Sequence, residues 1–148
     1  MPTSPRARRD RTPLDRDRIV AVAVDLADSA AGEHAYEAGH LPGAVYAHLE
    51  RDLAGAKSGR NGRHPLPARE AFAAAMGARG VGEDSHVIVY DGVGNAYAAR
   101  AWWMLRWMGH EAVAVLDGGL DAWRAAGGAV DAVAPAPRNG APYPDRTA

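Results

Sequence analysis

The residues best suited to chemistry lie around Asp91. An apolar run, Val87–Tyr90, ends at this aspartate, and a glycine-rich loop, GVGN, leads from it into a helical pattern. In α/β enzymes the turn between a strand and the next helix often holds a nucleophile or a bound phosphate. The sequence therefore predicts a candidate site over residues 91–95, with Asp91 as its central residue.

Three roles are open for the loop that begins at Asp91. The first is phosphate binding, since exposed N–H groups at a helix start attract anions. However, the chain has no GxxxxGK[ST] motif, and Tyr97 stands where GxGxxG needs its third glycine. A carboxylate nucleophile of the aspartyl-phosphate kind needs further acids and a lysine, whereas the chain has one lysine, Lys57, in a loop. The simplest role is a cap, in which Asp91 accepts hydrogen bonds from loop or helix N–H groups.

Cysteine chemistry is excluded, because the chain contains no cysteine. Disulfides, thiolate metal sites and cysteine nucleophiles are excluded with it. The histidines form neither HxxxH nor HExxH, so we expect turn or capping roles for them, with no metal and no cofactor. They are His34, His40, His48, His64, His86 and His110.

Composition favours one soluble globular domain. The chain has 148 residues, of which 47% are apolar and 24% charged, and its net charge is −1. That charge gives no reason to expect nucleic acid or a membrane as partner. No apolar stretch reaches the roughly 18 residues of a membrane span, and no signal-type segment is seen, so a cytoplasmic location is expected. Residues 1–18, rich in arginine, aspartate and proline, are expected to form a disordered arm.

Strand and helix patterns alternate along the rest of the chain. Strands are predicted over 19–24, within 41–47, over 86–90 and over 112–119; helices over 33–40, 68–80, 96–110 and 120–128; and a long loop over 51–67. This alternation predicts an α/β fold with a mostly parallel sheet and helices on both faces. Residues 91–95 and 117–119 then lie at the carboxyl edge of the sheet, where ligands bind.

The helix predicted after the loop is apolar on two sides. One side carries Tyr97 and Met104, and Trp103 and Trp107 form a second stripe flanked by Arg100 and Arg106. Either neighbouring helices of the same domain or a partner domain could cover the tryptophan stripe.

Taken together, these segments resemble the rhodanese family of sulfurtransferases. More narrowly, they resemble the N-terminal half of the two-domain thiosulfate and 3-mercaptopyruvate sulfurtransferases. The matching segments run from about Val20 to Gly128 and are YEAGHLPGAVYAHLERDLAG (36–55), GRHPLP (62–67), VIVYDGVGNAYAARAWWMLRWMGH (87–110) and AVAVLDGGLDAW (112–123). The resemblance implies a three-layer rhodanese-like fold over 19–131, followed by a proline-rich tail or interdomain linker remnant over 132–148.

The resemblance also implies a mechanism that this chain cannot perform alone. In the family, a cysteine directly after the strand carries sulfane sulfur as a persulfide, and Asp91 occupies that position here. No catalytic residue is therefore expected, and the chain would act with a cysteine-bearing rhodanese domain or subunit, meeting sulfur donors only through it. The expected vestigial loop and domain interface comprises Asp91, Gly92, Gly94, Asn95, Tyr97 and Arg100. Tyr97 is the best candidate for a residue at the entrance of the partner's site.

Two other interpretations stay open. The chain could be an inactive rhodanese module with a binding or regulatory role, or a truncated gene fragment. A cysteine-bearing rhodanese domain encoded next to it would favour the first interpretation, that of a non-catalytic half.

Overall fold

The computed structural model describes residues 16–25, 30–136 and 143. The strands are β1 (Ile19–Asp25), β2 (Val45–His48), β3 (His86–Tyr90) and β4 (Val113–Val115). The helices are the 3₁₀ turn η1 (Arg16–Arg18) and the α-helices α1 (Ala30–Ala38), α2 (Leu49–Asp52), α3 (Arg69–Ala78), α4 (Ala96–Trp107) and α5 (Gly119–Ala125). The expected disordered arm lies outside the described residues over 1–15.

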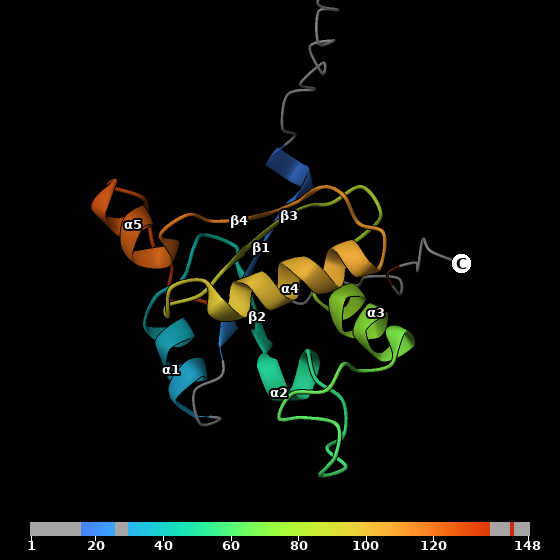
Figure 1. Ribbon diagram of the computed structural model, residues 1–148. Helices are drawn as coiled ribbons and strands as arrows, with labels where there is room; N and C mark the ends of the chain where they lie inside the picture. Colours follow the sequence, from blue (N-terminus) through green and yellow to red (C-terminus); the bar gives the residue numbers. More distant parts are fainter. Residues whose placement is uncertain (1–15, 26–29, 137–142, 144–148) are drawn as a thin grey trace, which may run out of the picture.

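The four strands form one sheet in the order β2-β1-β3-β4. Every pairing is parallel: β1 pairs with β2 and β3, and β3 pairs with β4. The helices connect successive strands, and α4 lies across the sheet (Figure 1). The predicted α/β class is confirmed, and within the described residues the sheet is wholly parallel.

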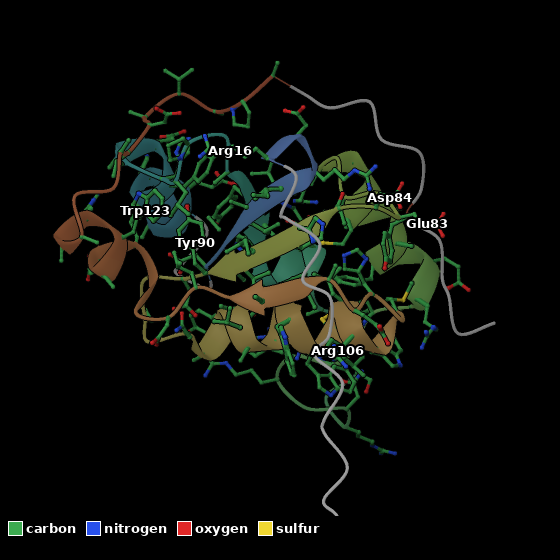
Figure 2. All side chains as sticks on the ribbon, turned by 90° about the horizontal axis from the view of Figure 1, so that it is seen from above. Arg16, Glu83, Asp84, Tyr90, Arg106 and Trp123 are labelled. Atoms are coloured by element: carbon green, nitrogen blue, oxygen red, sulfur yellow. The ribbon has the colours of Figure 1, made fainter. Side chains whose placement is uncertain are left out.

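Alternating residues of β1 face two different layers. Val20, Val22 and Val24 belong to a large core cluster with side chains from α2, α3 and α4. Ala21 and Ala23 point the other way, into a smaller cluster with side chains from α1 and α5. Figure 2 shows the sheet between α4 on one side and α1 on the other. Both faces are covered, which explains why Ile19–Val24 is apolar without alternation.

The helix α4 ends at Trp107, three residues before the predicted end at His110, and the glycine predicted to terminate it follows at position 109. Gly109 has a φ of 86°, a left-handed conformation, and the N–H of His110 reaches back to the carbonyl of Leu105 at 2.9 Å. This is the helix termination that glycine favours. The buried side of the helix carries Ala101, Met104 and Leu105.

Most element boundaries differ from the predictions by a few residues, and two differences are larger. The helix predicted over 33–40 spans 30–38, and the strand predicted over 112–119 is limited to Val113–Val115. The short helix α2 was missed, and it overlaps the predicted loop at Arg51 and Asp52. Its N-cap is His48, whose Nδ1 accepts hydrogen bonds from the N–H groups of Glu50 and Arg51. Histidine is not among the usual capping residues, so the start of this helix carries no standard signal.

Tyr143 lies in the segment expected to be a tail or linker remnant. Its side chain is 2% exposed and belongs to the large core cluster. The Tyr143 ring packs edge-on against the ring of His110, with 5.3 Å between the ring centroids.

Among the helices of the described residues, none has the length and the apolar composition that a membrane span requires.

Candidate functional site

Asp91 follows β3 directly and is 4% exposed. Its Oδ1 accepts hydrogen bonds from the N–H groups of Val93 at 2.9 Å and Asn95 at 2.7 Å. Its Oδ2 accepts hydrogen bonds from the N–H groups of Tyr97 at 2.8 Å and Ala98 at 3.0 Å. One carboxylate therefore accepts hydrogen bonds from four backbone N–H groups of the loop and the first turn of α4. The capping role predicted for Asp91 is confirmed.

The loop reaches this shape through two left-handed residues. Gly94 has a φ of 81° and Asn95 a φ of 68°, and asparagine is one of the few residues other than glycine that adopts this region readily. The side-chain amide of Asn95 donates a hydrogen bond to the carbonyl of Leu116 at 3.3 Å. This contact fixes the loop to the segment that follows β4.

Gly119 allows the loop after β4 to pass close to the Asp91 loop. Its φ is 60°, and a Cβ placed on it would lie 2.4 Å from the carbonyl oxygen of Asp91. No larger residue fits so close an approach of backbone to backbone. The expectation that residues 91–95 and 117–119 share one edge of the sheet is therefore confirmed.

The electrostatics of the loop suit an anion. Four N–H groups converge at the N-terminus of α4, where the helix dipole is positive. The loop thus has the geometry of an anion-binding cradle, and the carboxylate of the chain itself fills it. A carboxylate bound in this way can orient and stabilise the loop, but it cannot accept a sulfur atom to form a persulfide.

A pocket opens beside the loop, on the face covered by α1 and α5. Tyr36, Tyr46, Tyr90, Asp25 and Leu120 contribute to its lining together with Asp91 and Gly92. The labelled residues Tyr90 and Trp123 lie toward this side in Figure 2. The three tyrosines were missed by sequence reasoning, because they come from three different elements and share no spacing.

Burial raises the pKa of all three pocket tyrosines above its ordinary value. It raises the pKa of Tyr90 to about 12, against a smaller opposing effect of the hydrogen bond from the N–H of Leu41. Burial also raises the pKa of Tyr46 to about 12, helped by the negative charges of Asp25 and Glu33. The pocket therefore offers aromatic faces and neutral hydroxyls.

Tyr97 and Arg100 were predicted to belong to the vestigial loop and interface. The half-buried side chain of Tyr97 packs against the large core cluster, as the helical periodicity indicates. The guanidinium of Arg100 donates to the carbonyls of Leu53, at 2.8 and 3.1 Å, and of Pro65 at 3.2 Å. Burial lowers the pKa of Arg100. Arg100 fastens the segment after α2 to α4, and the interface roles of both residues remain predictions.

The tryptophan stripe of α4 is covered only in part. Trp103 remains 47% exposed and stacks on Trp107 at 5.9 Å between ring centroids. Arg69 covers Trp107, and Arg106 lies over Trp102. Figure 2 shows Arg106 on the outer side of α4, away from the sheet. The interpretation that neighbouring helices cover the stripe is therefore wrong for Trp103 within the described chain.

No metal centre is assembled by the described residues, among which no three histidine or acidic side chains gather closely enough to hold an ion. Of the histidines predicted to cap or turn the chain, His48 caps α2 as described above, and His40 is buried beneath the segment that follows α5.

Comparison with known proteins identifies the architecture. Residues 11–126 match the model of the Rhodanese-like domain. The chain is 49% identical over 104 residues to a probable 3-mercaptopyruvate sulfurtransferase of Pseudomonas aeruginosa, an alignment covering 69% of this chain and 37% of that protein. The chain thus spans little more than a third of the length of this relative.

Solved structures agree with that match. The 3-mercaptopyruvate sulfurtransferase of Leishmania major superposes with a TM-score of 0.75 at 31% identity, covering 88% of this chain and 37% of the other. SseA of Escherichia coli, described as having the rhodanese fold, superposes with a TM-score of 0.73 at 34% identity, covering 86% of this chain and 50% of the other. The matched part of these two-domain proteins is their N-terminal portion.

Proposed function

This chain belongs to the rhodanese family, and on that premise we propose that it is the non-catalytic half of a sulfurtransferase of the thiosulfate/3-mercaptopyruvate type. It is silent alone and acts with a cysteine-bearing rhodanese domain, on the same polypeptide or on a separate subunit. One observation carries this proposal: the cradle at the end of β3 is filled by the Asp91 carboxylate, which accepts four backbone N–H groups.

The chemistry of sulfur transfer supports the proposal. A persulfide forms when a thiolate attacks the transferable sulfur of the donor, the bond from that sulfur to the rest of the donor breaks, and the remainder leaves as an anion. The reaction therefore needs a thiolate and an anion-stabilising cradle. This chain has the N–H groups of such a cradle but no cysteine anywhere in its sequence. The thiolate must therefore come from the partner domain.

The role left for this half is to dock on the partner. The Asp91 loop presents Val93, which is 54% exposed, at its tip. The carboxylate holds this tip rigidly, because Oδ1 accepts the N–H of Val93 itself. We place the contact with the catalytic domain at this loop, with Gly92, Gly94, Asn95, Tyr97 and Arg100 around it.

The test mixes this chain with a separately produced cysteine-bearing domain of a two-domain sulfurtransferase. Binding is measured by calorimetry, and transfer of sulfur to cyanide is measured before and after mixing. We expect a complex and an increase in turnover, both weakened by Val93→Asp. Val133→Asp is the matched control, because Val133 is 80% exposed and lies outside the loop. Absence of binding would count against the proposal and favour one of the two other interpretations, a binding or regulatory module or a truncated gene fragment.

A further inference from the structure

The segment after α5 is held by few apolar contacts. Val133 is 80% exposed, and the residues on either side of it are exposed as well. The attachment is instead an isolated antiparallel bridge in which the N–H of His40 donates to the carbonyl of Asp131 at 2.8 Å and the N–H of Asp131 donates back at 2.9 Å. The backbone of His40 therefore holds Asp131, and the side chain of His40 lies next to the same segment.

Gly39 allows this close approach. A Cβ on Gly39 would lie 2.6 Å from the Arg124 guanidinium and 2.7 Å from the side chain of Val130. The chain that follows α5 thus passes directly over the end of α1. His40, the next residue, is fully buried beneath it.

Both ring nitrogens of His40 face acceptors. Nδ1 lies 2.7 Å from the carbonyl oxygen of Tyr36, and Nε2 lies 3.1 Å from the carbonyl oxygen of Val133. A carbonyl oxygen can only accept, so each bond needs a proton on its nitrogen. Only the imidazolium form makes both bonds, whereas either neutral tautomer makes one and turns a lone pair toward the other oxygen.

The end of α1 and an aromatic ring lie beside the His40 imidazole. The Tyr36 carbonyl belongs to the last turns of α1, the negative end of the helix dipole, and the imidazole stacks on the Tyr36 ring at 4.0 Å between centroids. The titratable groups on the neighbouring elements are Tyr36 of α1, whose ring is the stacked one, and Asp131, whose backbone bridges to His40. The Tyr90 hydroxyl of β3 accepts the N–H of Leu41, and Arg124 of α5 lies beside Gly39.

We propose that His40 is a proton-dependent latch on residues 131–133. The imidazolium fastens this segment to the end of α1 through Nε2 and the Val133 carbonyl. Loss of the proton leaves one ring bond, retained at the shorter contact with Tyr36, and loosens the segment while the domain stays folded. The latch is independent of the proposed function, because it uses neither the Asp91 loop nor the partner domain.

The test follows the His40 ring nitrogens by NMR in the ¹⁵N-labelled full chain during a pH titration, together with hydrogen exchange of the Asp131 amide corrected for its intrinsic pH dependence. We expect protection at Asp131 to fall roughly tenfold as the ring loses its second proton, the effect of one charge-assisted hydrogen bond. His48 serves as a control within the same protein, because its Nδ1 accepts hydrogen bonds from two N–H groups and that nitrogen therefore carries no proton in the fold.

Variants sharpen the result. His40→Asn should lower the protection at Asp131 and abolish its link to pH, while His34→Asn, at an exposed position of α1, should leave both unchanged. If His40→Asn does not fold, the titration of the unmodified chain decides alone. A His40 ring that stays neutral while residues 131–133 remain protected, or protection that does not change as the ring titrates, would overturn the proposal.

Discussion

The Oδ2 atom of Asp91 lies 2.8 Å from the backbone nitrogen of Tyr97, six residues further along the chain. This bond ties the end of β3 to the first turn of α4, and the other three bonds to the carboxylate close the loop between them. Asp91 thereby holds together the corner that, in our proposal, corresponds to the nucleophile position of the catalytic members of the family.

Removing this carboxylate should destabilise the domain. Asp91→Ala leaves four N–H groups without their acceptor, and we expect a loss of about 2–4 kcal/mol in the free energy of unfolding. Denaturant titration followed by circular dichroism measures it. Asp117→Ala is the control, because Asp117 is exposed in the loop after β4, and its effect should stay within about 0.5 kcal/mol. Equal effects of the two substitutions would contradict the capping role.

Gly119→Ala should damage the same corner from the opposite side. The new Cβ would meet the Asp91 carbonyl, whereas a Cβ at Gly94 would meet nothing within 4 Å although its φ is also positive. Both substitutions share the backbone strain, so the difference between them isolates the clash. We expect Gly119→Ala to cost at least about 1 kcal/mol more in unfolding free energy than Gly94→Ala. A smaller cost than that of Gly94→Ala would show that the two loops separate freely.

Placing the nucleophile here should not restore activity. Asp91→Cys supplies a thiol, but GVGNAY is not the catalytic loop of the family, and one sulfur atom cannot replace two carboxylate oxygens that bind four N–H groups. We expect little sulfur transfer from thiosulfate to cyanide in this single variant. Robust turnover would mean that the cradle was competent all along and lacked only its cysteine.

Alkaline pH should destabilise the fold through the pocket tyrosines. The pKa of Tyr46 is raised to about 12, above that of an unfolded tyrosine near 10. Its contribution to stability is therefore complete below pH ~10 and is lost as the pH rises toward 12. Unfolding free energies across this range should fall less steeply in Tyr46→Phe. An unchanged slope in this variant would exclude Tyr46 as a source of the alkaline loss.

The local features of the site could be predicted from the sequence, and the tertiary ones could not. The apolar run before Asp91 and the two glycines after it encode a strand, a turn and a helix start, so the capping role of Asp91 follows from adjacent residues. The pocket wall joins Tyr36 of α1 with Tyr46 and Tyr90, which the parallel pairing of β1 with β2 and β3 sets on either side of Ala23. The spacing of residues along the sequence does not predict such a contact between distant elements.

The exposed Trp103 shows a second limit. Helical periodicity identifies two apolar sides of α4, but it cannot say what covers each of them. The structure covers one side with the sheet and leaves Trp103 open on the other. Because a helix on a parallel sheet buries mainly the side that faces the sheet, the pattern alone does not predict what covers the outer side.

Sulfur transfer by the purified chain alone is the most direct measurement of the central claim. The chain is incubated with thiosulfate or 3-mercaptopyruvate, cyanide is added as acceptor, and thiocyanate formation and the intact protein mass are recorded. If the chain is non-catalytic, no thiocyanate forms above a protein-free blank, and the protein mass does not increase by that of a sulfur atom. Turnover above the blank, with contaminating rhodanese excluded by the mass spectrum, would contradict it.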